Sequence, residues 1–525
     1  MSGGPDLVSL LYQADWAQLS LSAVANDGTR VLVAPGRRYR VEAGDCLTGC
    51  DGDRPWRLDA EEAQDADRDV HWVSAPEPPL PELLCPAWLL VSSQLEVRGD
   101  VRVCGRDAFH VEVTRRAGLN RRHVPPQFRA GRAAVMVDAE LGILLRLTWL
   151  ADEAEPEVTE LASLDLDPVI DPALFRPPPG SLIAESAADA LGTGGAGWTA
   201  LKTVAGVAAG GLGAWIRYVP STQKRTAEQA GDDEAPLSPD GPAPERSPDG
   251  RPVGPPVNGQ VLQLLHDSTT SEFAATVHEW TDFGAMLSQV PPGARRAGFG
   301  GLGLLVDSIS ERPATTHQIS SLRMAGPDRY RIDYTRDDQR SPVMMACDGQ
   351  RCWRVYRDRV TTGPAAPLPS GIAEMLDPSW LLGCRLSGGA SVLVGDRQAY
   401  RINVARGENG WPLAWPLIFP AAVAVVDAGT GVLLRLTSYI GEQPVRRCEL
   451  RDITATAGDF TIDIPPGLPV TEETGPLGDE GHHGGPHRVG IPLKVVGVAA
   501  GQVATGVAKD AAKVAGNFLR RISDR

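Results

Sequence analysis

The chain has 525 residues, of which 42% are hydrophobic, and its formal net charge is −15. That length leaves room for about two to four domains, and the hydrophobic share excludes a wholly disordered protein. The negative charge argues against a nucleic-acid partner, because phosphate binding needs a basic face. Eight cysteines are too few for a disulfide-stapled scaffold.

The start of the chain lacks the pattern of a secretion signal. No basic region leads into an apolar stretch there, and Asp6 and Asp15 interrupt the apolar residues. The sequence also contains no run of 18 apolar residues, so we expect no transmembrane helix. We therefore expect a cytoplasmic protein that can lie at the periphery of a membrane.

One eight-residue motif occurs twice, as CDGDRPWR in Cys50–Arg57 and as CDGQRCWR in Cys347–Arg354. Five further blocks accompany each copy in the same order. The paired blocks are Ala34–Glu42 with Ala325–Asp333, Pro79–Leu90 with Pro367–Leu382, Val103–Val113 with Leu393–Val404, Val137–Thr148 with Val426–Thr437, and Phe175–Gly180 with Ile462–Gly467. This order indicates a duplicated domain. We place the two copies at residues 1–182 and 259–470.

Within each copy, apolar and polar residues alternate with a period of two, as in RYRVE, FHVEV and LLRLT. That period predicts half-buried antiparallel strands. The CDG and VDAxxG segments predict hairpin turns, and we expect a structural role for the residues that start and close the second turn. Those residues are Asp138, Gly142, Asp427 and Gly431. The segments ending in WLL have leucines at helical spacing and predict short helices against one face of each sheet.

The order of the blocks resembles the LolA/RseB-type fold of the lipoprotein carrier superfamily. Members run through a DGxxxW motif, a Pro-rich helical lid, a VDxxxGxxLR hairpin and a final FxPPG, and the resemblance covers most of residues 5–182 and 259–470. It implies an α+β, mostly antiparallel fold with two duplicated, unclosed half-barrels under helical lids. The concave apolar face of such a half-barrel can hold acyl chains or a lipidated peptide. The candidates to line this ligand cavity, or alternatively to form plain core, are Trp56, Trp88, Trp353 and Trp380.

Two segments lie outside the copies. Residues 183–258 contain a Gly/Ala-rich helical pattern and then a Pro- and charge-rich stretch typical of a disordered linker. Residues 471–525 begin with a similar linker and end in Ile491–Arg525, where apolar residues recur every three or four positions, as in an amphipathic helix. An anionic membrane surface is one expected partner of this helix, and its own domain or a partner helix is the alternative. The membrane-contact candidates are Lys494, Lys509, Lys513, Phe518, Arg520 and Arg521.

Motifs of catalysis and metal binding are missing from the sequence. It contains no HExxH, P-loop or GxSxG pattern, so we expect no enzyme, no cofactor and no metal. Cys46 with Cys50 and Cys347 with Cys352 do not have the CxxC spacing of a redox or zinc site, and we expect free thiols.

Two functional hypotheses of different classes follow. The first is non-enzymatic binding of a lipid or lipidated peptide in the half-barrel cavities, at a membrane surface. The alternative is a regulatory or protein-interaction module whose cavities are filled, with a protein partner. An open apolar concavity would favour the first, and bulky side chains inside it would favour the second. A more remote hypothesis places a hydrolase site in an insertion at Glu279–Ser320.

Overall fold

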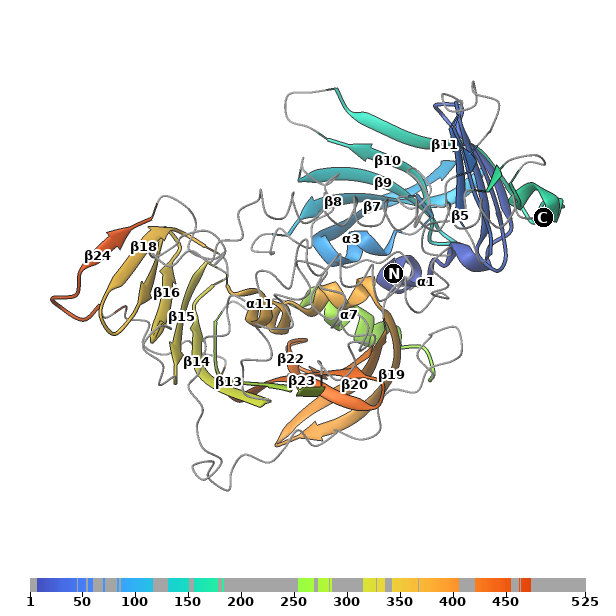
Figure 1. Ribbon diagram of the computed structural model, residues 1–525. Helices are drawn as coiled ribbons and strands as arrows, with labels where there is room; N and C mark the ends of the chain where they lie inside the picture. Colours follow the sequence, from blue (N-terminus) through green and yellow to red (C-terminus); the bar gives the residue numbers. More distant parts are fainter. Residues whose placement is uncertain are drawn as a thin grey trace, which may run out of the picture.

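Two large, mostly antiparallel sheets face one another in the computed structural model, and short helices lie between them (Figure 1). The structure describes residues 7–44, 46–52, 55–59, 69–70, 83–84, 86–116, 131–150, 155–177, 182–183, 254–268, 272–282, 284–285, 315–326, 328–335, 342–366, 368–405, 421–454, 462 and 464–473. None of the helices in this part of the chain is long and apolar enough to cross a membrane.

The first sheet has ten strands in the order β5-β4-β3-β2-β1-β11-β10-β9-β8-β7, with antiparallel neighbours throughout. Its strands are β1 (Leu21–Ala25), β2 (Arg30–Ala34), β3 (Arg38–Ala43), β4 (Cys46–Asp51), β5 (Pro55–Asp59), β7 (Ser93–Val103), β8 (Arg106–Arg115), β9 (Arg132–Asp138), β10 (Leu144–Trp149) and β11 (Glu157–Leu166). The accompanying elements are α1 (Leu7–Gln13), α3 (Ala87–Ser92), the 3-10 turns η1 (Trp16–Gln18) and η5 (Pro172–Phe175), and a parallel pair of β6 (Asp69–Val70) with β12 (Leu182–Ile183).

The second sheet has twelve strands in the order β19-β20-β21-β22-β23-β13-β14-β15-β16-β17-β18-β24. Its strands are β13 (Phe273–Asp282), β14 (Thr315–Met324), β15 (Arg329–Tyr334), β16 (Met344–Asp348), β17 (Arg351–Val355), β18 (Val360–Pro364), β19 (Arg385–Val394), β20 (Arg397–Ala405), β21 (Ala421–Asp427), β22 (Leu433–Ile440), β23 (Gln443–Thr454) and β24 (Val470–Glu472). Its helical elements are α7 (Gly259–Asp267), α11 (Ser370–Leu376) and the 3-10 turn η8 (Pro378–Gly383).

The two strand orders correspond, which confirms the predicted fold class of two duplicated, mostly antiparallel sheets. The first ten strands of the second sheet follow the sequence blocks of the first sheet one for one, and β18 and β24 are an addition at one edge. Neither sheet closes on itself, because the two end strands of each order do not pair with each other. Each repeat is therefore an unclosed half-barrel.

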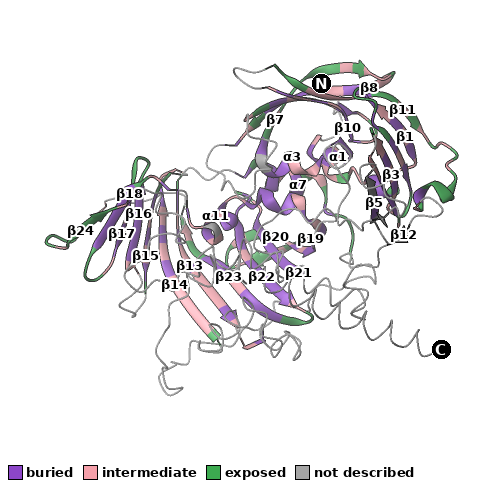
Figure 2. Cartoon of the chain, turned by 45° about the horizontal axis from the view of Figure 1, so that its top comes forward, coloured by how far each residue is buried: buried purple, intermediate pink, exposed green. Residues whose placement is uncertain are grey.

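A hydrophobic core connects the two repeats. Strands such as β1 and β3 alternate buried and half-buried residues, so one face of each sheet is apolar. A single cluster of buried side chains contains residues from these faces and from the helices of both repeats. Figure 2 shows that the helices between the sheets are largely buried. The concave faces are thus covered by the protein's own helices.

The repeated VDAxxG hairpin has the same hydrogen bonds in both copies. Asp138 Oδ1 accepts the backbone N–H groups of Glu140 and Leu141, and Asp427 Oδ1 accepts those of Gly429 and Thr430. Each aspartate also forms an ion pair with an arginine that begins the preceding strand. The pairs are Arg106 with Asp138 and Arg397 with Asp427. Both aspartates therefore hold turns.

The glycine that closes each turn touches the first helix of its repeat. Gly142 and Gly431 have φ values of +71° and +77°, which disfavour any side chain. A Cβ on Gly431 would lie 2.6 Å from the carbonyl oxygen of Leu264, and one on Gly142 would overlap that of Leu10. The two glycines let the hairpins approach α7 and α1 in the same way, so Leu10 and Leu264 occupy corresponding positions.

The insertion in the second repeat is shorter than the sequence suggested. Glu279 pairs with Gln318 and Val277 pairs with Ser320 in the β13–β14 ladder, so both ends of the expected insertion Glu279–Ser320 are strand residues. Part of the expected insertion is instead additional strand, because β13 and β14 have ten residues each, whereas β1 and β2 have five.

Candidate functional site at the seam between the repeats

The two lid segments of the repeats pack against each other. Trp88-Leu89-Leu90 lies on α3 and Trp380-Leu381-Leu382 on η8, and the two elements are in contact. All four of these leucines are 0% exposed. The Ser379 hydroxyl donates a hydrogen bond to the carbonyl of Val91 at 3.0 Å. We call this contact between corresponding lid segments the seam.

The first helices of the repeats extend the seam, since α1 contacts α7. Tyr12 on α1 reaches the other repeat, where its hydroxyl donates to the carbonyl of Cys384 at 3.1 Å and accepts the N–H of Leu386 at 2.8 Å. Burial raises the pKa of Tyr12 well above its usual range. The tyrosine therefore stays neutral and connects α1 to the start of β19.

His266 occupies the position in α7 that corresponds to Tyr12, two residues after Leu264 as Tyr12 is two residues after Leu10. It is 5% exposed, and its Nδ1 lies 2.9 Å from Asp267 Oδ1. Its Nε2 is buried and makes no hydrogen bond to the described residues. Burial and, next, the charge of Arg116 lower the pKa of His266. A neutral imidazole that donates from Nδ1 to Asp267 has a lone pair on Nε2.

Arg116 connects this histidine to the first repeat. The side chain is 8% exposed, and its Nε donates to the carbonyl of Ser93 at 2.9 Å, at the start of β7. Its guanidinium also donates to the carbonyl of His266. The buried guanidinium of Arg116 thus connects the end of α7 to the start of β7. This connection corresponds to the one that Tyr12 makes between α1 and the start of β19.

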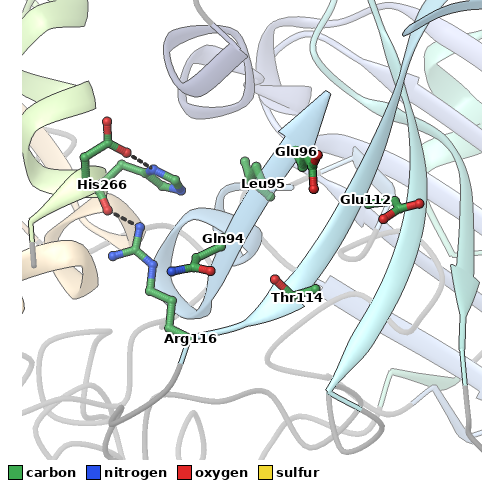
Figure 3. A pocket seen from close by; sticks show the side chains of 8 residues that line it. Gln94, Leu95, Glu96, Glu112, Thr114, Arg116 and His266 are labelled. Atoms are coloured by element: carbon green, nitrogen blue, oxygen red, sulfur yellow. Dashed lines mark hydrogen bonds and ion pairs between the residues drawn. The ribbon is translucent and has the colours of Figure 1, made fainter. Parts of the chain in front are cut away.

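A cleft of about 400 Å³ lies beside His266 (Figure 3). Strands β7 and β8 of the first repeat form one wall, and the end of α7 forms the other. The lining residues are Gln94, Leu95, Glu96, Glu112, Thr114, Arg116, His266 and Asp267.

The cleft is lined by charged side chains that can form hydrogen bonds with a polar ligand. Arg98 donates to Glu112 at 2.7 Å and also contacts Glu96, which leaves carboxylate oxygens with acceptor capacity. No group of three or more metal-ligating side chains occurs among the described residues. The site can therefore offer the carboxylates of Glu96 and Glu112 as hydrogen-bond acceptors to a polar ligand.

The predicted cavity tryptophans divide into two pairs. Trp88 is half-buried, with its ring 5.7 Å from that of Trp149, next to the shared core. Trp380 is 2% exposed, and its Nε1 donates to the carbonyl of Glu374 at 3.0 Å. Both belong to the lid segments that cover the concave faces.

Trp56 and Trp353 lie on the opposite, convex faces, which corrects the expectation that they line the concavity. Trp56 is paired with Gly49, the neighbour of the core residue Cys50, and successive strand residues point to opposite faces. The Trp56 Nε1 donates to the carbonyl of Phe175 at 2.9 Å.

Trp353 and Ile462 both pack against a separate small cluster of buried residues. Ile462 corresponds to Phe175 in the duplicated sequence. Each DGxxxW tryptophan therefore lies on the same side of its sheet as the residue that begins the closing segment, outside the half-barrel.

The membrane-contact candidates of the C-terminal segment lie outside the described residues. Conversely, sequence reasoning missed Tyr12, Arg116 and His266. The alignment of the two first helices pairs Tyr12 with His266, but only the packing of the repeats shows that this position faces the other repeat.

No family model matches the sequence, and no curated protein matches it. Several solved structures are similar to it. An uncharacterised conserved protein from Thermus thermophilus is 8% identical, and the match covers 41% of this chain and 98% of that chain with a TM-score of 0.24. The MucA/MucB complex of Pseudomonas aeruginosa is 15% identical, and the match covers 35% of this chain and 63% of that chain with a TM-score of 0.21. A LolA superfamily protein from Nitrosomonas europaea is 9% identical, and the match covers 39% of this chain and 93% of that chain with a TM-score of 0.17.

A LolA superfamily protein and the MucB complex are therefore among the structures that this chain resembles, as the sequence motifs indicated. Each of these matches covers less than half of the chain.

Proposed function

We propose that the chain is a non-enzymatic regulatory or protein-interaction module with filled half-barrels, rather than a carrier that holds an acyl chain. The observation that carries this proposal is the seam, where Leu89 and Leu90 pack with Leu381 and Leu382. A lipid could enter either concave face only after its lid had separated from the other repeat. The two lids therefore hold each other closed.

The energetic cost of opening supports the same conclusion. Burial of one leucine side chain stabilises a protein by about 1.5–3 kcal/mol, so exposing the four seam leucines costs on the order of 10 kcal/mol. That is comparable to the whole stability of a typical domain. An acyl chain that leaves a bilayer only exchanges one apolar environment for another, and it cannot offset this cost.

The concave face of the second sheet is also unsuited to an acyl chain. Glu279 and Arg446 form an ion pair on this face, on the same side as the core residues Val277 and Cys448. Glu374 on α11 is also buried. Placing hydrocarbon against charged side chains is unfavourable, because it replaces their polar surroundings.

Surfaces for a protein partner exist at the sheet edges. Strand β19 ends the second sheet, and Leu393 on this strand is 73% exposed. An edge strand with exposed apolar side chains can receive a strand from another chain. We infer that a partner binds along the outside of the repeats.

Native mass spectrometry tests the choice between the two hypotheses. The intact chain is incubated with vesicles of phosphatidylglycerol and phosphatidylethanolamine and then weighed. We expect the mass of the free chain. One or two lipids per chain would overturn the proposal in favour of an open carrier.

A photo-crosslinking residue at Leu393 tests the interaction itself, with one at the exposed hairpin residue Glu442 as the matched control. We expect discrete protein adducts in cells at Leu393 only. Equal labelling at both positions, or none at Leu393, would count against a partner at this edge.

A further inference from the structure

Two cysteines face each other across a hairpin of the second sheet. Cys347 at the end of β16 is paired with Cys352 at the start of β17, and both side chains are 0% exposed. Asp348 fixes the turn between them by accepting the N–H groups of Gln350 and Arg351, each at 2.8 Å. Directly opposite residues in an antiparallel ladder have Cα atoms about 4.5–5.5 Å apart. A disulfide needs about 4.4–6.8 Å, so a directly opposite pair lies within the range that a disulfide requires.

The surroundings give the two thiols different roles. The Cys352 sulfur accepts the N–H of Ala366 at 3.1 Å and lies 3.8 Å from the Tyr330 hydroxyl. A hydrogen bond from Cys352 lowers the pKa of Cys347, and the same contact raises the pKa of Cys352. Cys347 is therefore the better nucleophile, because the thiolate is the reactive form.

The first repeat lacks this arrangement. Cys50 occupies the position of Cys347 in the repeated motif, but the residue paired with it across the ladder is Pro55. The duplicated fold therefore does not need two cysteines here, and Cys50 provides an internal control.

We propose that Cys347 and Cys352 form a reversible two-electron redox couple that a hydroperoxide converts into a cross-strand disulfide. The Cys347 thiolate attacks one oxygen of the peroxide, the O–O bond breaks, and a sulfenic acid forms with release of hydroxide or alkoxide. The Cys352 sulfur then attacks the Cys347 sulfur and displaces water. Two thiols and one hydroperoxide give one disulfide, one water and one alcohol, or a second water when the oxidant is H₂O₂. A dithiol restores both thiols by exchange.

The oxidation state of Cys347 and Cys352 affects how firmly the lid of the second repeat is held. Ala366 begins the segment that leads into α11, and its N–H donates to the Cys352 sulfur at 3.1 Å. Oxidation removes the S–H group and moves the sulfur towards Cys347. The hydrogen bond from the Ala366 N–H to the Cys352 sulfur is then weakened, so the lid is held less firmly in the oxidised chain.

Peptide mapping tests the proposal directly. The reduced full-length chain is treated with a small excess of H₂O₂, alkylated under denaturing conditions and digested with trypsin. Cleavage after Arg340, Arg351 and Arg354 places the two cysteines in separate peptides, SPVMMACDGQR and CWR. We expect these peptides to be recovered joined by a disulfide and to separate after dithiothreitol. Recovery of both in alkylated form, or of Cys347 as a sulfinic or sulfonic acid, would overturn the proposal.

Two variants complete the test. Cys50→Ser should form the joined peptides as the wild type does, whereas in Cys347→Ser the peptide CWR should be recovered alkylated; recovery of CWR joined to a different cysteine peptide in that variant would refute the assignment. If Cys347→Ser does not fold, the wild-type mapping still decides. Hydrogen exchange of the Ala366 amide should become about threefold to tenfold faster on oxidation, the effect of one weakened hydrogen bond. An unchanged exchange rate would disprove the coupling to the lid.

Discussion

Tyr12 and His266 occupy corresponding positions in the first helices of the two repeats, but only the Tyr12 side chain makes two close hydrogen bonds across the seam. The tyrosine hydroxyl satisfies two backbone groups at the start of β19. The shorter imidazole has the Ser93 backbone near it, but its buried Nε2 makes no close hydrogen bond to the described residues, and it lies next to a cleft of about 400 Å³. The approximate twofold relationship between the repeats is therefore broken at one position, and a cleft lies at that position.

Replacing His266 by Tyr should restore the missing contact. The phenol extends further than imidazole, and its hydroxyl can reach the start of β7 as Tyr12 reaches β19. We expect a gain of about 0.5–1.5 kcal/mol, the net value of one hydrogen bond, as an increase in the free energy of unfolding in urea. The reverse change, Tyr12→His, leaves the Leu386 N–H unpaired and should cost about 1–3 kcal/mol. If His266→Tyr destabilises as much as Tyr12→His, the two positions are not equivalent.

His266 also makes stability depend on pH. Burial, with the charge of Arg116, lowers its pKa in the folded chain, whereas in the unfolded chain it titrates near pH 6.5 or so. Below about that pH the unfolded chain binds more protons, so the free energy of unfolding falls as the pH falls. We expect a larger loss of stability between about pH 7.5 and about pH 5 for the wild type than for His266→Gln. Parallel curves for the two proteins would show that His266 is not responsible.

The hairpin glycines allow backbone strain to be separated from helix packing. Gly142 and Gly105 both have φ near +75°, but a Cβ would overlap the Leu10 carbonyl only at Gly142, and nothing lies within 4 Å of it at Gly105. Gly105→Ala should cost about 1–2 kcal/mol from the left-handed backbone alone. Gly142→Ala should cost clearly more, about 3 kcal/mol or above. Chemical denaturation of both variants measures the difference, and equal costs would argue against a tight contact between hairpin and helix.

Much of the fold could be predicted from the sequence because its causes are local. Alternating residues in RYRVE and LLRLT led to the correct strands, and the VDAxxG pattern led to the turns held by Asp138 and Asp427. The repetition of the blocks predicted two copies with the same strand order. These signals depend on neighbours in the chain, which a single sequence displays.

The site could not be predicted because it depends on how the repeats pack. Trp56 and Trp353 were candidates either to line the concave faces or to form plain core, and only the register of β5 and β17 shows that they lie on the other side of their sheets. The seam joins Leu89 to Leu381 through a contact between segments that are far apart in the sequence. Nothing in the local pattern distinguishes a lid that covers a ligand from a lid that packs on another lid.

The C-terminal segment Ile491–Arg525 carries a prediction that depends on its sequence alone. Its basic residues near an anionic bilayer contribute about 1 kcal/mol each, and its apolar positions recur at helical spacing. We expect the full-length chain to sediment with vesicles rich in phosphatidylglycerol at low salt, and its deletion variant lacking Ile491–Arg525 to remain in the supernatant.

The charge and the apolar side of this segment can be tested separately. Changing Lys509, Lys513, Arg520 and Arg521 to Gln should remove the salt-sensitive part of the binding, because screening acts on charges. Phe518→Ala should weaken binding at every salt concentration, since it removes apolar area. If the deletion variant sediments as the full chain does, the segment does not bind the membrane. Its apolar positions would then have to pack on the half-barrels or on a partner helix.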